Sequence, residues 1–171
     1  PQWFISMESH GLRDKALKAI DNTDFYPSKG KERIKSMIET RPDWCVSRQR
    51  VWGVPLPIFI SKKTGDVLVD DEVFENIAKI YEKEGSDCWF NEDYQIFLGD
   101  KYKAEDYEKL SDIVEVWFDS GSTHSFVLEK RDDLKWPASM YLEGSDQHRG
   151  WFHSSLLESC GTRGVAPFES I

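Results

Sequence analysis

Cysteine is scarce in this chain of 171 residues, and the few cysteines form no metal-binding or disulfide motif. Cys45, Cys88 and Cys160 lie far apart and include no CxxC pair. This spacing argues against a zinc knuckle and a disulfide framework, and it favours a reducing compartment. We therefore predict free, mostly buried thiols and a cytoplasmic protein.

Other signals are absent as well. No apolar run approaches the roughly 18 residues of a membrane span, and no basic segment followed by an apolar stretch suggests a signal peptide. The sequence has no HExxH or GxSxG motif and no P-loop. His148 and His153 are five positions apart, so they point to different helix faces and make a poor metal pair. We predict no membrane partner and no metal held by this chain.

Charge is unevenly distributed. The net charge of −9 argues against a nucleic-acid binder. However, residues 1–52 contain ten basic and seven acidic residues, whereas residues 53–171 are acidic. Any phosphate backbone is therefore expected to meet the first third of the chain.

The hydrophobic pattern predicts a mixture of helices and strands. Helical spacing indicates helices over 12–21, 31–40 and from Phe74 to Gly85. Segments 54–60 and 67–69 are typical of a β-hairpin. In the last third, strands over 112–118 and 139–142 are each followed by a helix start, at Asp119 and over 147–160.

Two strand–loop–helix units indicate an α/β fold with part of a Rossmann-like, doubly wound parallel sheet. The hairpin and helix between them predict an inserted α+β segment. We accordingly divide the chain into residues 1–54, an acidic inserted segment over 55–110, and a second half of the core over 111–171.

The segment YLEGSDQHRGWF is the first candidate site. Gly144 admits a ligand close to the backbone, and the helix start behind it offers free N–H groups. Glu143 or Asp146 could accept hydrogen bonds from ribose hydroxyls, and Gln147 could donate to a carbonyl. Trp151, four positions after Gln147, could wall an apolar pocket. The alternative is that Asp146 is only a helix cap and Trp151 only core.

Two further segments carry candidate residues. Trp117 stands at the end of a predicted strand, beside a helix start, where it could be a pocket wall or simply core. Arg48, Arg50 and Trp52 interleave guanidinium groups with an indole, which suits a phosphate backbone and stacked bases. A solvated ion-pair strip is an equally good interpretation of these residues.

Together, three stretches resemble the isoleucyl-tRNA synthetase family, in the order that family has them. They are RPDWCVSRQRVWGVPLP, EVWFDSGSTHSFVL and YLEGSDQHRGWFHSSLL. The opening PQWF also resembles the return segment after that family's editing insertion. Leucyl and valyl relatives share the character of the first block only.

The resemblance implies a class I aminoacyl-tRNA synthetase with a Rossmann core, an enzyme expected to be a monomer. Such a ligase activates isoleucine with ATP to isoleucyl-adenylate and transfers the acyl group to tRNA(Ile), with Mg²⁺ entering only with ATP. Trp117 and Trp151 would wall the isoleucine pocket. The ribose and carbonyl region of the adenylate would contact Glu143, Gly144, Asp146 and Gln147. The tRNA acceptor end would lie near Arg48, Arg50 and Trp52.

Two motifs of that family, HIGH and KMSKS, are missing here. We therefore expect an internal piece of a catalytic region that supplies pocket residues but does not aminoacylate alone. No catalytic base is expected, because attack on the α-phosphate needs alignment and charge neutralisation. The main alternative is a tRNA- or protein-binding module on a synthetase-like scaffold. A hydrolase using Asp119, Asp146 and His148 is a more distant one.

Overall fold

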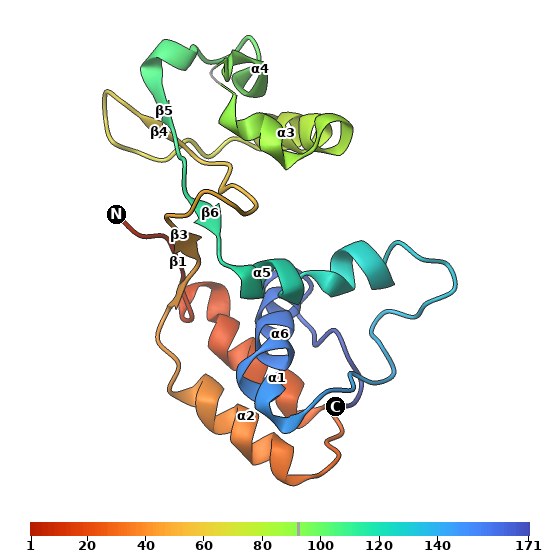
Figure 1. Cartoon of the computed structure of the whole chain (residues 1–171). Helices are drawn as coiled ribbons and strands as arrows, with labels where there is room; N and C mark the ends of the chain where they lie inside the picture. Colours follow the sequence, from red (N-terminus) through yellow and green to blue (C-terminus); the bar gives the residue numbers. More distant parts are fainter. Residues whose placement is uncertain (92) are drawn as a thin grey trace. The chain divides into compact units, whose positions relative to one another are not determined.

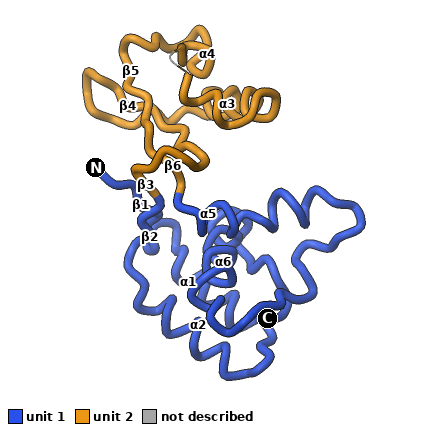
Figure 2. Tube along the Cα trace, viewed as in Figure 1, with its two compact units in different colours: residues 1–46, 115–171 blue, residues 47–114 orange. Residues whose placement is uncertain are grey.

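The computed structural model describes residues 1–91 and 93–171, which fall into two compact units (Figure 2). Unit 1 comprises Pro1–Val46 and Glu115–Ile171, and unit 2 comprises Ser47–Val114. Each unit has a hydrophobic core of its own. No helix within the described residues is both long enough and apolar enough to cross a membrane.

Unit 1 is mainly helical (Figure 1). Its elements are β1 (Phe4–Ile5), η1 (Ser9–Gly11), α1 (Leu12–Asp21), α2 (Lys29–Glu39), β2 (Trp44–Cys45), α5 (Val116–Gly121), the π-helical turn η4 (His124–Leu128), η5 (Ser145–Arg149) and α6 (Trp151–Thr162).

Helices α1, α2 and α6 form the core of unit 1. The predicted helix over 12–21 is confirmed as α1, because its buried residues recur at helical spacing. Helix α2 begins two residues earlier than predicted, at Lys29. Gly30 on α2 lets the His148 ring approach, since an added Cβ would lie 2.6 Å from His148 Nε2. The buried face of α6 packs against α1 and α5.

Three extended segments of unit 1 run parallel to one another. Isolated parallel bridges join Asp24 to Ser170 and Ala138 to Phe168. The Tyr26 backbone N–H donates to the Ile171 carbonyl oxygen at 2.7 Å. The segment 167–171 therefore lies between 24–26 and 138–141. The strand predicted over 139–142 is not formed, because the isolated bridge is at Ala138 and Tyr141 adds only one backbone hydrogen bond, to the Ser170 carbonyl oxygen.

In the last third of the chain the structure differs from the predicted strand over 112–118 and from the predicted helix over 147–160. Of the predicted strand over 112–118, only β6 (Ile113–Val114) is a strand, and α5 begins at Val116. Asp119 therefore lies inside a helix rather than at its start. A short apolar run is compatible with either a strand or a buried helix. In this segment the packing of α5 on α6 favours the helix. The helix predicted over 147–160 is divided at Gly150 into η5 and α6.

Unit 2 is smaller. Its elements are β3 (Ser47–Arg48), β4 (Phe59–Ser61), α3 (Asp71–Glu84), η2 (Ser86–Phe90), α4 (Gln95–Leu98), η3 (Ala104–Asp106), β5 (Tyr107–Lys109) and β6. Strand β3 pairs with β6, and β4 with β5. As in the β1–β2 pair of unit 1, both pairings are antiparallel. The described residues thus combine helices with small two-stranded sheets.

Local signals set the boundaries of α3. The Asp70 carboxylate accepts a hydrogen bond from the Glu72 backbone N–H at 3.0 Å, which caps the helix start. The helix ends before Gly85, whose φ of 81° favours glycine. The predicted hairpin is only partly formed, because Val67 makes one bridge to Ile60 while β4 takes its main partner from β5.

Candidate functional site

The Trp151 side chain, at the start of α6, is held on several sides. Its indole Nε1 donates to the Ser120 carbonyl oxygen at 3.0 Å, and its backbone N–H donates to Gln147 Oε1 at 2.9 Å. The indole stacks on the Tyr141 ring, with centroids 4.0 Å apart and planes 2° apart. The Tyr141 hydroxyl lies 3.1 Å from Ser155 Oγ. Trp151 is therefore fixed in one orientation by contacts from α5, from η5 and from Tyr141 in the segment that precedes η5.

Gly150 connects Trp151 to the second predicted pocket wall. A Cβ added at Gly150 would lie 3.1 Å from Trp117 Cη2 and 2.4 Å from Gln147 Oε1. Trp117 on α5 is 42% exposed, so its ring has contacts on one side and solvent on the other. The structure thus brings Trp117, Gln147 and Trp151 together around one glycine. That Trp117 and Trp151 wall a ligand pocket stays a prediction.

The loop before η5 carries the other predicted contacts. Glu143, Gly144 and Asp146 are exposed, and the Gly144 backbone N–H donates to Glu143 Oε2 at 3.3 Å. Gln147 Nε2 donates to Asp146 Oδ2 at 3.1 Å. The cap position of η5 belongs to Gly144 rather than to Asp146. The Asp146 carboxylate therefore does not cap η5, and it accepts its hydrogen bond from the Gln147 side chain.

The predicted tRNA-proximal residues lie in unit 2. Arg48 is in β3, opposite Ile113, and its Nη1 donates to the Ser47 carbonyl oxygen at 2.8 Å. Arg50 and Trp52 follow on an exposed loop, and the Trp52 side chain is 90% exposed. An indole presented in this way offers an open face for stacking.

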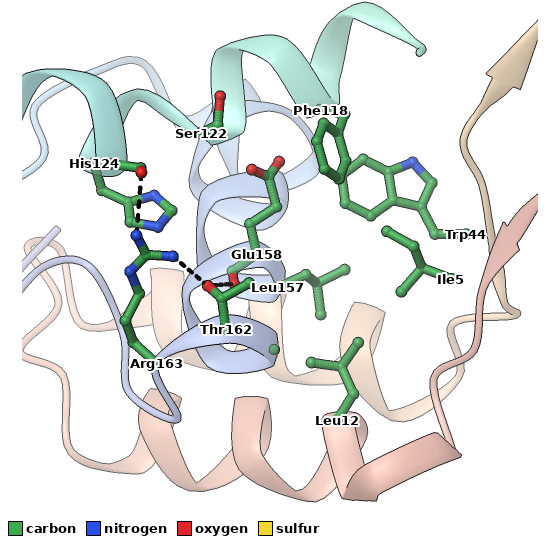
Figure 3. Close-up of a pocket in the computed structure, with 12 residues that line it drawn as sticks. Ile5, Leu12, Trp44, Phe118, Ser122, His124, Leu157, Glu158, Thr162 and Arg163 are labelled. Carbon is green, nitrogen blue, oxygen red and sulfur yellow. Dashed lines mark hydrogen bonds between the residues drawn. The ribbon is translucent and has the colours of Figure 1, made fainter. Parts of the chain in front are cut away.

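Unit 1 also contains a cavity of about 350 Å³ that no sequence motif predicts (Figure 3). Apolar side chains make one part of its wall, and polar side chains make the other. The lining comprises Ile5, Leu12, Trp44, Phe118, Ser122, His124, Ser125, Leu157, Glu158, Gly161, Thr162 and Arg163.

Glu158 is the most unusual group on the cavity wall. Its side chain belongs to the buried face of α6 and is 9% exposed, and its Oε1 has no hydrogen-bond partner. Burial raises the pKa of Glu158 to about 9, and the carboxyl groups of Asp119 and Glu115 act in the same direction. No sequence pattern identifies Glu158, because a single acidic residue among 151–162 forms no motif.

We expect Glu158→Gln to stabilise the protein above about pH 5. The pKa of Glu158 is higher in the folded protein than in the unfolded chain, so the unfolded chain loses the carboxyl proton at lower pH. The free energy of unfolding therefore falls as pH rises from about 4.5 towards 9. Glutamine removes that dependence, which amounts to about 4–5 kcal/mol at pH 8 for a pKa raised from 4.5 to about 9. Urea unfolding at pH 5, 7 and 8.5 measures the difference. The exposed Glu39→Gln variant is the control, and a gap between the Glu158 variant and wild type that does not widen with pH would contradict the expectation.

The arrangement gives no support to a hydrolase centred on Asp119, Asp146 and His148. The His148 ring is buried against Gly30 and packs edge-on against Phe152. Its Nδ1 lies 2.7 Å from the Ser145 carbonyl oxygen, so the ring has a structural position. Across residues 1–91 and 93–171, no cluster of three or more metal-ligating side chains is present.

The whole chain, residues 1–171, matches the family described as "tRNA synthetases class I (I, L, M and V)", and it belongs to that family. It is 84% identical over 171 residues to an isoleucine–tRNA ligase of Pelagibacter ubique (strain HTCC1062). It is also 54% identical over 180 residues to an isoleucine–tRNA ligase of Zymomonas mobilis and 56% over 177 residues to one of Brucella abortus biovar 1. Each match covers 100% of this chain but only 18–19% of the relative. The chain therefore spans about a fifth of the length of the curated relatives it matches.

Proposed function

We propose that this chain is part of an isoleucine–tRNA ligase and contributes residues to its amino-acid and adenylate site. The whole protein would activate isoleucine with ATP, bring in Mg²⁺ with the nucleotide, act as a monomer and charge tRNA(Ile). The observation that carries the proposal is the convergence of Trp117, Gln147 and Trp151 around Gly150. The identity of 84% to a relative named isoleucine–tRNA ligase supports the choice of amino acid.

In this proposal the site works by positioning. The two indoles take the branched hydrocarbon side chain, while Glu143, Asp146 and Gln147 take the ribose and carbonyl region. The missing side chain of Gly144 lets the Asp146 carboxylate lie against the loop, because a Cβ at Gly144 would be 2.6 Å from Asp146 Oδ1. Alignment of the isoleucine carboxylate with the α-phosphate of ATP then accelerates the reaction, and no proton-transferring base is required. Because this chain lacks the HIGH and KMSKS motifs, we expect that it does not catalyse ATP–pyrophosphate exchange by itself.

The arrangement of the chain in the larger protein is also a proposal. The parallel segments 24–26, 138–141 and 167–171 support the idea that unit 1 contributes to a doubly wound parallel sheet of the Rossmann type. Residues 1–54 and 111–171 would then belong to the catalytic core. The acidic segment 55–110 would be an insertion, consistent with its separate hydrophobic core.

Replacing Trp117 tests the amino-acid site. In the full-length protein, Trp117→Ala should raise the KM for isoleucine about tenfold in ATP–pyrophosphate exchange, because an aromatic wall is lost. The KM for ATP should change little. Phe126→Ala, which removes another exposed aromatic side chain of unit 1, is the matched control. An unchanged KM for isoleucine would contradict the assignment, and absence of exchange in the wild type would favour a binding module.

Replacing Trp52 tests the tRNA contact separately. Loss of one base-stacking side chain weakens binding by about 1–3 kcal/mol. Trp52→Ala should therefore raise the KM for tRNA about tenfold or more, with a much smaller effect on isoleucine activation. Steady-state charging at varied tRNA concentration measures this. A variant that charges tRNA with an unchanged KM would place Trp52 outside the interface.

A further inference from the structure

The cavity of unit 1 is separate from the proposed amino-acid and adenylate site. None of the residues predicted for that site lines it. Figure 3 shows the Glu158 side chain between His124 on one side and the rings of Phe118 and Trp44 on the other. The cavity thus has a polar end and an aromatic end that share one buried carboxyl group. Its volume of about 350 Å³ is within the range of small-molecule sites.

Two buried hydrogen-bond acceptors on this wall have no donor. One is Glu158 Oε1, and the other is His124 Nε2. His124 Nδ1 lies 3.0 Å from the Gly121 carbonyl oxygen, so Nδ1 carries the proton and Nε2 presents a lone pair. Burial lowers the pKa of His124 and outweighs the hydrogen bond to the Gly121 carbonyl oxygen, which raises it; Arg163 lowers the pKa further and Glu129 raises it. The net shift favours the neutral ring. Buried acceptors without donors are costly, and a ligand with N–H groups satisfies them.

Charge at the cavity favours a cation. The carboxyl groups of Asp119 and Glu115 lie close enough to Glu158 to affect its ionisation. Glu115 accepts the Trp44 indole N–H at 2.9 Å. The one cationic side chain in the lining, Arg163, is paired with Glu129 through two hydrogen bonds of 2.7 and 2.8 Å. Glu158 on the wall and the nearby Asp119 and Glu115 are thus three acidic groups beside two cations. Arg163 lowers the pKa of Glu158 and is paired with Glu129, and Arg41 interacts with Glu115 and lies 5.5 Å from the Trp44 ring centroid.

The other wall suits a hydrocarbon body. Leu12, Leu157 and Ile5 offer aliphatic surface, and Trp44 and Phe118 offer aromatic faces. Aromatic faces attract cations as well as hydrocarbon. A ligand that combines an ammonium group with an apolar body matches both ends of the cavity.

We propose that this cavity is a binding site for a small primary ammonium compound with an aryl or alkyl body, whose N–H groups donate to Glu158 and His124. 2-Phenylethylammonium combines these two parts and is small enough for a cavity of about 350 Å³. Because the pKa of Glu158 is raised to about 9, the carboxyl holds a proton at neutral pH. One proton leaves Glu158 for solvent as each cation binds. Affinity should therefore increase about tenfold per pH unit between pH 7 and 8.5.

The test uses the full-length protein, previously saturated with a non-hydrolysable isoleucyl-adenylate analogue so that the proposed amino-acid site is filled. 2-Phenylethylammonium is titrated by calorimetry at pH 7, 7.75 and 8.5. The neutral 2-phenylethanol and the anionic 3-phenylpropionate are comparison ligands. We expect saturable binding of the ammonium compound alone, with the stated rise in affinity.

Two variants locate the binding. Glu158→Gln should lower affinity about thirtyfold and remove the pH dependence, whereas the exposed Glu39→Gln should change neither. Gly161→Leu should block the cavity without touching Glu158, because a Cβ there would lie 3.7 Å from Leu12 Cδ1, an ordinary contact. Thermal unfolding checks that each variant is folded. No binding by the wild type, equal binding of the alcohol, or affinity unaffected by both cavity variants would overturn the proposal.

Discussion

Gly150→Ala is expected to lower kcat/KM for isoleucine activation about a hundredfold in the full-length protein. The added methyl group would meet Gln147 Oε1 at 2.4 Å and Trp117 Cη2 at 3.1 Å, so both side chains must move. Moving Gln147 also removes the hydrogen bond that its Oε1 accepts from the Trp151 backbone N–H. Displacement of positioning groups by about 1 Å can reduce a rate about a hundredfold. ATP–pyrophosphate exchange at varied isoleucine concentration measures the effect.

Gly161→Ala is the matched control for this prediction. Gly161 is on α6, which begins directly after Gly150, but a Cβ at Gly161 makes only an ordinary contact with Leu12 Cδ1. Alanine within a helix is favoured over glycine by about 0.5–1 kcal/mol, so this variant should be slightly more stable and fully active. Near wild-type activity of folded Gly150→Ala would show that the convergence around Gly150 has no part in the reaction.

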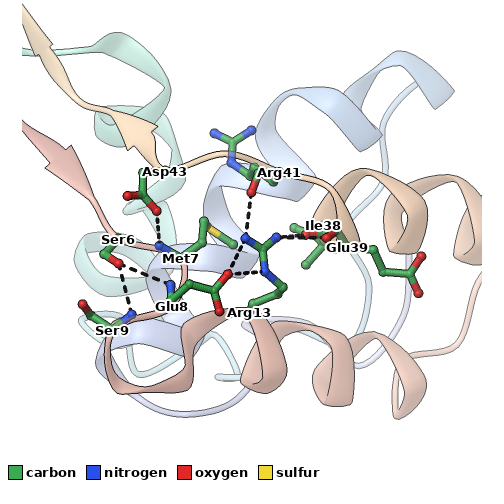
Figure 4. Close-up of polar contacts among 9 residues, drawn as sticks. All are labelled: Ser6, Met7, Glu8, Ser9, Arg13, Ile38, Glu39, Arg41 and Asp43. Atoms are coloured by element: carbon green, nitrogen blue, oxygen red, sulfur yellow. Dashed lines mark hydrogen bonds and ion pairs between the residues drawn. The ribbon is translucent and has the colours of Figure 1, made fainter.

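Arg13→Ala should destabilise the end of α2 by about 3 kcal/mol. Figure 4 shows the Arg13 guanidinium at the last carbonyl groups of that helix. It donates to the carbonyl oxygens of Ile38, Glu39 and Arg41, the last at 2.8 Å, and its Nε donates to Glu8 Oε1 at 2.7 Å. The side chain is only 19% exposed, so its loss leaves carbonyl groups poorly solvated. Each such charge-assisted bond contributes about 1.5–3 kcal/mol, and the contributions are not additive.

Hydrogen exchange of backbone amides over residues 29–41 measures this loss as a lower free energy of local opening. Arg13→Lys should recover only part of it, because an ammonium group lacks the planar fork that reaches several carbonyl groups. Arg33→Ala, which removes an exposed arginine from α2 itself, should leave exchange nearly unchanged. Equal protection in the Arg13 and Arg33 variants would refute the role of Arg13 as a helix cap.

The sequence predicted those elements whose signals are local. Helix α1 has the expected bounds, and α3 ends at Gly85 as expected, because periodic burial and terminal residues determine such helices. Helix α5 was missed, since six residues contain too few turns for a period to be seen. The antiparallel partner of β4 comes from 107–109, a pairing that depends on chain folding at long range.

The candidate site shows the same division. The residue types and motifs identified the segments that carry Trp117, Gln147 and Trp151, but spacing alone did not place them around Gly150. The stacking of Tyr141 on Trp151 and the burial of Glu158 left no pattern in the sequence that distinguishes them from ordinary core residues. Such features depend on how helices pack, and packing joins residues that are distant in the chain.

Within the loop, the Gln147 side-chain N–H donates to the Asp146 carboxylate in one hydrogen bond of 3.1 Å. A ligand that offers only a carbonyl oxygen breaks this bond and leaves the Asp146 carboxylate without its partner. A ligand that offers only ribose hydroxyl groups leaves the N–H of the Gln147 amide without its hydrogen-bond acceptor. An adenylate presents both groups on one molecule, so a single exchange of partners satisfies both side chains. Under the proposed function, the loop therefore binds the joined intermediate more tightly than its separated halves predict.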